Sequence, residues 1–281
     1  MDGVFMAEKQ IAVMAASFAF SFPAKMLALI KSNLKFGEVV TQYPTIGIPT
    51  TEQRRLQNLL SQSPPFGLIG ICIRPEATMI AEYRAANIPI VLIDEEMNGA
   101  ATVTTDNFEG GYLAGKHFIN SGRRNIAVVS GRTNIEGSYN ATHKLQGFLK
   151  ALAENDLHFD QNNLIEVTDY SYSDGAKSMR ILLDQREKID AVFSAAGDEC
   201  AVGILKTARE RGIHIPLNVA VIGYDDIEIA KSANPPLTTI RQPLFEMASA
   251  AYRMVTIAAN ETLALSTKTL FRPELIIRES A

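Results

Sequence analysis

Short, almost wholly apolar segments recur along the chain and alternate with longer amphipathic ones. Six of them are nearly continuous and are bounded by Gly, Pro or Asp: residues 11–16, 67–73, 88–94, 125–131, 190–196 and 219–225. Runs of this length and composition are typical of β-strands that are buried on both faces, as in parallel sheets. The sequence therefore predicts parallel β-sheet with covered faces.

The segments between these strands have the spacing of amphipathic helices. In residues 23–34 and again in residues 141–155, the apolar side chains recur every three or four positions. Strands and helices in strict alternation imply right-handed βαβ crossovers and a doubly wound sheet. A chain of 281 residues is long enough for two such sheets. The expected fold is therefore α/β, with two doubly wound parallel-sheet lobes.

The first apolar segment also resembles a secretory signal. Residues 11–24 carry no charge, are rich in Ala and Ser, and follow Lys9. They are too few to cross a bilayer as a helix, which needs about 20 apolar residues. Glu8 stands beside that lysine, which favours a buried strand that runs into a loop ending at Pro23. A cleaved signal, and with it an exported solute-binding protein, stays open as the alternative.

Composition and charge narrow the function classes. The chain is 47% hydrophobic and has a net charge of −4, so it lacks the basic excess with which nucleic-acid binders neutralise phosphates. Cys72 and Cys200 both lie among apolar residues, which fits neither a disulfide framework nor a zinc site and favours a reducing, cytoplasmic compartment. The four histidines are scattered. No metal and no cofactor are expected.

Enzymatic signatures are weak. Residues 110–116 have the spacing of a phosphate-binding loop, but His117 stands where Ser or Thr should bind Mg²⁺. The sequence has neither a GxSxG elbow nor a cysteine with a neighbouring histidine. The acid pairs 95–96 and 225–226 could do acid–base chemistry, but solvated or capping roles are favoured for them. The sequence therefore predicts a protein that is not an enzyme.

Polar and aromatic residues follow several of the predicted strands. They are Ser17, Phe18, Phe20 and Phe22 after the first strand, Asp106, Asn107 and Glu109 after residues 103–105, and Asp225 with Asp226. Ligands of open parallel sheets bind outside the carboxyl ends of the strands, and such residues suit a small polar molecule with apolar faces. The alternative is that Asp106 and Asp198, each opening a helix, are only N-caps.

Three motifs stand in a characteristic order. DNFEGG at 106–111, VIGYDD at 221–226 and PPLTTIRQP at 235–243 resemble the effector-binding core of the lactose-repressor (LacI/GalR) family, with similarity from about Ile11 to Ser280. The resemblance implies a type I periplasmic-binding-protein-like fold, in which two lobes joined by three crossovers clamp a ligand. It also implies a homodimer.

The resemblance, with the strand count, gives expected lobe boundaries. The N-terminal lobe would contain residues 1–121 and 243–268, and the C-terminal lobe residues 122–242 and 269–281, with a last strand at 270–277 and a hinge crossing at 235–243. The homodimer would use the helix at 23–34 and the apolar face of Ala201, Ile204, Leu205 and Ala208. Alternatively, these apolar stripes only cover their own sheets.

The resemblance also implies a ligand site. Its expected members are Ser17, Phe18, Phe20, Phe22, Glu109, Lys144, Tyr170, Asp198 and Asp225. Lys144 replaces the family's usual Arg, and Gly197 replaces an Asn that often precedes Asp198. These departures weaken a match to an ordinary sugar, so the expected ligand is a small polar molecule that is either sugar-like or amine-bearing. For Tyr170, an exposed turn residue is the alternative.

Family members carry a helix-turn-helix headpiece before this core. Here only ten residues precede the first strand, so DNA would be contacted only through a headpiece that is not in this chain, and no membrane partner is expected. The predicted function is ligand sensing for a transcription regulator. A free-standing solute-binding protein and an enzyme acting on a small polar substrate are the alternatives, which export and turnover would reveal.

Overall fold

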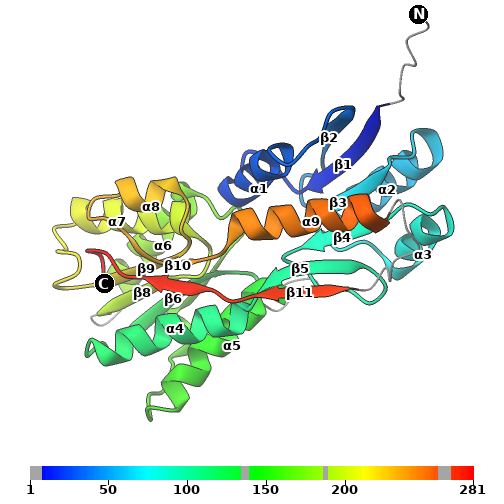
Figure 1. The fold of residues 1–281 in the computed structure, drawn as a ribbon. Coiled ribbons are helices and arrows are strands. Elements are labelled where there is room, and N and C mark those ends of the chain that lie inside the picture. The colour runs from blue at the N-terminus through cyan, green and yellow to red at the C-terminus, as the bar shows by residue number, and fades with distance from the viewer. Residues whose placement is uncertain (1–7, 134–138, 186–188, 259–266) are drawn as a thin grey trace, which may run out of the picture. The chain divides into compact units, whose positions relative to one another are not determined.

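The computed structural model describes residues 8–133, 139–185, 189–258 and 267–281 (Figure 1). The chain divides into two compact units. Unit 1 contains residues 1–104 and 244–271, and unit 2 contains residues 105–243 and 272–281. The chain therefore passes from one unit to the other three times, after residues 104, 243 and 271.

Unit 1 is a six-stranded sheet covered by helices. The sheet has the order β11-β5-β4-β3-β1-β2, and β1 to β5 pair in parallel. Its strands are β1 (Lys9–Ala15), β2 (Glu38–Pro44), β3 (Gly67–Ile71), β4 (Ile90–Ile93), β5 (Ala101–Thr105) and β11 (Lys268–Phe271). Its helices are α1 (Ser21–Lys31), α2 (Pro49–Gln62), α3 (Ala77–Ala85) and α9 (Leu244–Ala258).

Unit 2 repeats this plan with a second six-stranded sheet. The order is β12-β10-β9-β8-β6-β7, with β12 antiparallel to β10. Its strands are β6 (Ile126–Gly131), β7 (Leu164–Val167), β8 (Ala191–Ser194), β9 (Ala220–Asp225), β10 (Thr238–Arg241) and β12 (Glu274–Ile276). Its helices are α4 (Asn107–Asn120), α5 (Tyr139–Ala153), α6 (Tyr172–Gln185), α7 (Asp198–Glu210), α8 (Glu228–Ser232) and the short 3₁₀ turn η1 (Gln161–Asn163).

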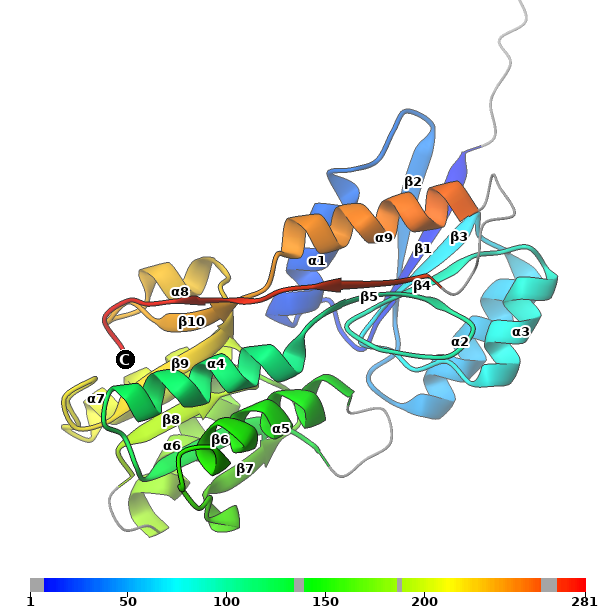
Figure 2. The same ribbon diagram turned by 60° about the horizontal axis from the view of Figure 1, so that its bottom comes forward.

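The apolar strands are buried on both faces, as their sequences predict. In unit 2, α4 and α5 cover one face of the sheet, where Phe148 stacks on Phe193 with ring centroids 5.6 Å apart. Helices α6 and α7 cover the other face, where Met179 packs with Ile204 and Val221. In unit 1, α2 and α3 cover one face, and α1 and α9 lie side by side (Figure 2). The predicted α/β class is confirmed, and so is β1 as a buried strand.

The predicted lobe boundary at residue 121 is wrong. Helix α4 belongs to unit 2, because it packs directly on α5. A Cβ added at Gly111 would lie 1.8 Å from the backbone oxygen of Lys144, and one at Gly147 would lie 1.8 Å from that of Phe108. The two glycines thus let the helix backbones touch, and this contact ties α4 to unit 2.

The predicted last strand and hinge crossing also need correction. Residues 270–277 do not form one strand of the second unit. Instead, β11 joins the sheet of unit 1 and β12 joins that of unit 2. Residues 238–241 of the expected crossing form β10 inside the second sheet, so the chain leaves unit 2 only after Pro243.

The helix faces predicted to form a dimer are internal. Ala201, Ile204, Leu205 and Ala208 are at most 1% exposed and belong to the core of unit 2. In α1, Met26, Leu27 and Ile30 are buried as well. These stripes cover their own sheets, which was the alternative. Within the ranges that the structure describes, none of the helices has the length and apolar character needed to span a membrane.

Candidate functional site

The carboxyl end of β9 carries two consecutive aspartates in a left-handed backbone conformation. Asp225 has φ 104° and Asp226 has φ 55°. Residues other than glycine rarely adopt positive φ, because Cβ then crowds the backbone, so the surrounding structure must hold this turn in place. The turn sends the two carboxylates to different partners.

Asp225 is mostly buried but still reaches solvent. Its residue exposure is 9%, and its Oδ1 accepts a 2.7 Å hydrogen bond from the Nε2 of Gln242. Gly197 lies beside it, where an added Cβ would be 3.2 Å from Oδ2. The Oε1 of Gln242 is buried and has no hydrogen-bond partner among the described residues. The carboxylate of Asp225 and the amide oxygen of Gln242 are therefore two hydrogen-bond acceptors in one place, and the amide oxygen has no donor among the described residues.

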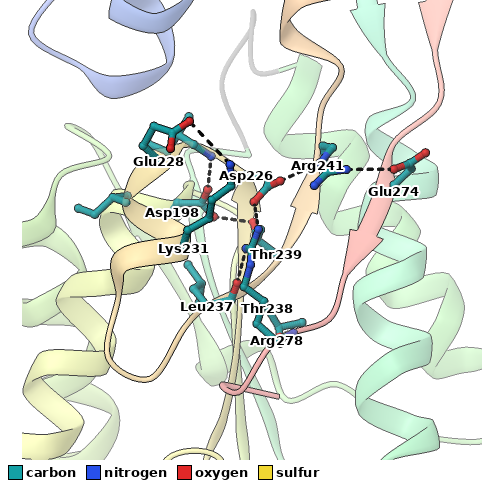
Figure 3. A network of polar contacts seen from close by, with 12 residues as sticks. Asp198, Asp226, Glu228, Lys231, Leu237, Thr238, Thr239, Arg241, Glu274 and Arg278 are labelled. Carbon is teal, nitrogen blue, oxygen red and sulfur yellow. Dashed lines mark hydrogen bonds and ion pairs between the residues drawn. The ribbon is translucent and has the colours of Figure 1, made fainter.

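Asp226 has a structural role. Its Oδ2 accepts a 2.7 Å hydrogen bond from the Nε of Arg241, and its Oδ1 pairs with Arg278 from the C-terminal segment (Figure 3). Arg241 also pairs with Glu274 on β12, at 3.5 Å. Because the carboxylate is only 3% exposed and holds two guanidinium groups, Asp226 ties β9, β10 and the chain end together.

Asp198 is neither an open ligand contact nor the N-cap of its helix. It is fully buried, its Oδ1 accepts from the hydroxyl of Thr239 at 2.5 Å, and its Oδ2 accepts from the backbone N–H of Ile227 at 2.9 Å. Burial, followed by repulsion from Asp225, raises its pKa well above the usual range. Gly197 is the N-cap instead. The prediction of Asp198 as an open ligand group is therefore corrected to a supporting role.

Replacing Asp198 by alanine is expected to cost about 2–4 kcal/mol of stability, because it leaves the buried Thr239 hydroxyl and the half-buried Ile227 N–H without this acceptor. Urea unfolding followed by circular dichroism measures the loss. Glu210→Ala, at the exposed end of α7, is the control and should change stability by less than about 0.5 kcal/mol. Equal stabilities for the two variants would contradict the supporting role.

Lys144 is a buried cation on an aromatic face. Its residue exposure is 7%, and its Nζ lies 3.9 Å from the ring centroid of Tyr224 and 3.4 Å from the carbonyl oxygen of Ala195. Of the ion pairs found among the described residues, none involves this ammonium group. A cation–π contact and one long hydrogen bond leave donor capacity on Nζ for a further acceptor.

The start of α4 confirms one of the two capping alternatives. Asp106 is the N-cap of this helix, and its carboxylate accepts a 2.9 Å hydrogen bond from the backbone N–H of Glu109. Glu109 itself lies half-buried in the first helical turn. The near match to a phosphate-binding loop, residues 110–116, lies wholly inside α4.

Tyr170 follows β7 and is partly packed. Its backbone has φ 55° and its residue exposure is 39%. A Cβ added at Gly131, the last residue of β6, would lie 2.0 Å from the hydroxyl oxygen of Tyr170. The tyrosine therefore rests its hydroxyl on the carboxyl end of β6, next to the strand that ends at Ser194.

The first loop of unit 1 and the start of α1 hold the remaining predicted residues. The hydroxyl of Ser17 accepts a 3.1 Å hydrogen bond from the backbone N–H of Ala19. Phe18, Phe20 and Phe22 are half-buried, and Phe20 is the N-cap of α1 without a side-chain hydrogen bond. The structure thus places these four residues at the carboxyl end of β1.

Sequence reasoning missed an acidic cluster at the ends of β3 and β4. Glu95 was expected to be solvated or to cap a helix, but it is 3% exposed and pairs with Arg74 at 2.9 Å. Asp94 is equally buried, and Glu52 in α2 is 8% exposed. The signal that could have revealed Asp94 and Glu95 is their position directly after a continuous apolar strand. Within the described ranges, no group of three or more His, Cys, Asp or Glu side chains could hold a metal ion.

Two doubly wound units, joined by three crossings and carrying polar side chains at their strand ends, define the class of periplasmic-binding-type ligand-binding modules. Residues 116–281 match the family model described as "Periplasmic binding protein-like domain". The chain belongs to this family and, within it, to the effector-binding cores of LacI/GalR transcription regulators. This confirms the predicted family.

Several similar proteins are named as regulators. The HTH-type transcriptional repressor PurR of Escherichia fergusonii is 31% identical over 253 residues, which are 88% of this chain and 72% of that protein. A LacI family transcriptional regulator from Lactobacillus casei with bound sucrose is 27% identical, with a TM-score of 0.85 over 97% of this chain and 99% of that one. A LacI regulator from Lactobacillus casei with bound Tris is 27% identical, with a TM-score of 0.84 over 98% of both chains.

Proposed function

We propose that this chain is the ligand-sensing domain of a LacI/GalR-type transcription regulator, and that it binds a small polar effector at the carboxyl ends of the strands of its two units. The observation that carries this proposal is Asp225, a carboxylate held on a left-handed turn at the end of a buried strand. Such a group pays for its desolvation only if a ligand or a protein donor satisfies it. Gln242 donates a hydrogen bond to its Oδ1.

The chemistry of unit 2 favours a ligand with several hydrogen-bond donors. Asp225 and the unsatisfied Oε1 of Gln242 are acceptors, and they suit hydroxyl or ammonium groups. Lys144 adds a donor for a ligand oxygen. Sugar-like and amine-bearing molecules both meet these needs. The sucrose and the Tris bound by the Lactobacillus casei regulator are one example of each.

The proposed ligand-binding residues are Ser17, Phe18, Phe20, Phe22, Glu109, Lys144, Tyr170 and Asp225, with Asp198 supporting the turn that carries Asp225. Aromatic rings would cover the apolar faces of the ligand, and charged groups would take its polar edge. Ser17 and Phe18 follow β1, Tyr170 follows β7 and Asp225 ends β9, whereas Glu109 and Lys144 lie in α4 and α5.

Ligand binding would act on a segment that joins the units. Gln242 directly precedes Pro243, after which the chain leaves unit 2. A ligand that engages Asp225 competes with Gln242 and so acts on the residue beside this crossing. An effector changes the activity of a regulator only if it binds one arrangement of the protein better than another. We propose that this preference biases a DNA-binding headpiece in a cytoplasmic homodimer, and that the chain catalyses no reaction.

The test is a thermal-unfolding screen of the purified chain with sucrose, ribose, Tris and free amino sugars. A ligand at a hundred times its dissociation constant should stabilise the protein by about 2.7 kcal/mol, which is several degrees in Tm. Ligands that shift Tm are then incubated with the protein and recovered. Recovery of the ligand in unchanged form supports a sensing role, and conversion of the ligand into a product would contradict it.

A further inference from the structure

The segment that follows β12 is hydrogen-bonded to the starts of β9 and β10. Ser280 is fully buried, and its hydroxyl donates a 2.6 Å hydrogen bond to the carbonyl oxygen of Val221 and accepts one of 2.8 Å from the backbone N–H of Thr238. The carbonyl oxygen of Ser280 accepts a 2.7 Å hydrogen bond from the backbone N–H of Val221. The backbone N–H of Arg278 donates to the hydroxyl of Thr238 at 2.9 Å. The backbone of Arg278 is therefore fixed beside β10.

The side chain of Arg278 extends from this segment to Asp226. Its Nη1 donates a 2.7 Å hydrogen bond to the carbonyl oxygen of Leu237, and its Nη2 donates to the Oδ1 of Asp226 (Figure 3). The side chain of Arg278 is 14% exposed, whereas that of Arg241, which also pairs with Asp226, is 44% exposed. Because solvent screens a buried ion pair less than an exposed one, we expect Arg278 to bind this carboxylate more strongly than Arg241 does.

Asp226 lies in a turn that is held at three consecutive residues. The two arginines donate to Asp226 itself, and the amide of Gln242 donates to Asp225 before it. The backbone N–H of Ile227, after it, donates to Asp198. Asp225 and Asp226 both have positive φ, which residues other than glycine keep only when surrounding contacts hold them. The partners of Asp226 therefore help to fix the direction of the neighbouring Asp225 carboxylate.

We propose that Arg278 is a positioning residue of the ligand site, which holds Asp226 and thereby keeps the carboxylate of Asp225 directed at the effector. This inference rests on the proposed function, in which Asp225 binds the effector. Without Arg278, the Oδ1 of Asp226 would lose its charged donor, although the side chain is only 3% exposed. Asp226 would then turn toward solvent, and the left-handed backbone beside it would relax.

The first test needs no ligand. The Nε2 group of Gln242 reports the position of Asp225, because it donates to the Oδ1 of this residue at 2.7 Å. In ¹H–¹⁵N correlation spectra of the unmodified chain, its two proton signals should be shifted from those of exposed glutamines, and their loss in Gln242→Met identifies them. Arg278→Gln should move these signals most of the way to the exposed-glutamine values.

Ser280→Ala is the matched control. It removes both hydrogen bonds of a buried hydroxyl in the same segment and so lowers stability, but it leaves the pair of Arg278 with Asp226 in place. Its Gln242 signals should match those of the unmodified chain. Unmoved Gln242 signals in Arg278→Gln, or equal movement in both variants, would overturn the proposal, because Arg278 would then act on stability alone.

The second test is calorimetric titration of the unmodified chain and both variants with sucrose and with Tris, at a temperature where all three are folded. Arg278→Gln should bind the probe that the unmodified chain binds about tenfold more weakly, which corresponds to the loss of one charge-assisted hydrogen bond. Ser280→Ala should bind it normally. Unchanged affinity in Arg278→Gln would overturn the proposal. If the unmodified chain binds neither probe, that result counts against the proposed effector class, and the Gln242 signals still decide whether Arg278 positions Asp225.

Discussion

Replacing Gly147 by alanine is expected to destabilise unit 2 by about 3 kcal/mol. An added Cβ would lie 1.8 Å from the backbone oxygen of Phe108 and 3.0 Å from the backbone nitrogen of Tyr112, both in α4. Backbone atoms cannot turn away as a flexible side chain can, so the two helices must separate. Separation opens gaps in the core around Phe148 and Phe193, which pack beneath this crossing.

Denaturant unfolding of the variant, followed by far-UV circular dichroism, measures this loss. Gly115→Ala is the graded comparison, because its Cβ would meet the Cβ of Ala151 at 2.8 Å and only one backbone atom within 3.4 Å, the oxygen of Phe148 at 3.1 Å. Alanine is also a better helix former than glycine, by up to about 1 kcal/mol, so this variant should lose much less. If the Gly147→Ala variant is as stable as the unmodified chain, that result would contradict the packing of α4 on α5.

Replacing Asp226 by alanine is expected to cost about 3–5 kcal/mol, since it removes the common partner of two arginines. Arg278 has a side chain that is only 14% exposed, and among the described residues its guanidinium would keep the carbonyl of Leu237, which accepts from Nη1, as a partner. Strands β9 and β10 and the C-terminal segment would lose the charged connection that Asp226 makes between them (Figure 3).

The matched control is Asp184→Ala, which breaks an ion pair of similar geometry on the surface. Asp184 and Arg211 are 2.8 Å apart, but their side chains are 54% and 45% exposed. A solvent-exposed pair contributes at most about 1 kcal/mol. Similar losses for Asp226→Ala and Asp184→Ala in urea unfolding would show that burial of Asp226 does not matter.

The strongly apolar strands could be predicted from the sequence, and the edge strands could not. Strands such as β6 and β9 are buried along their whole length, so a continuous apolar run in the sequence is enough to predict them as central strands. Strand β2 is half-buried and mixes polar with apolar residues, and β7 is similar. Their strand conformation comes from pairing with β1 and β6, which a local pattern does not contain.

The unit boundary depended on contacts between residues far apart in the chain. Gly111 and Lys144 lie in contact where α4 crosses α5, and the sequence around either residue does not indicate that the other will be its neighbour in space. The role of Asp198 is similar, because an aspartate opening a helix has the same sequence pattern whether it caps that helix or binds elsewhere. Its partner Thr239 lies 41 residues away.

The sequence indicated a candidate site residue where a motif lies at the end of a strand, as at Asp225. It did not indicate the role of a residue where that role depends on the surrounding side chains. Asp225 and Asp226 are adjacent and chemically identical, yet one holds two arginines and the other retains 9% exposure beside an unsatisfied amide oxygen. The left-handed backbone at both residues directs the two carboxylates to different partners, and the surrounding strands hold this conformation in place.

The most direct test of ligand sensing is calorimetric titration of Asp225→Ala with a ligand that stabilises the unmodified chain. The substitution removes a charge-assisted hydrogen bond, so the affinity should fall by about 1.5–3 kcal/mol, which is roughly ten- to a hundredfold. Glu228→Ala, three residues away with a side chain that is 78% exposed, is the control and should bind normally. Unchanged affinity in Asp225→Ala would contradict the account, and so would an equal loss in both variants.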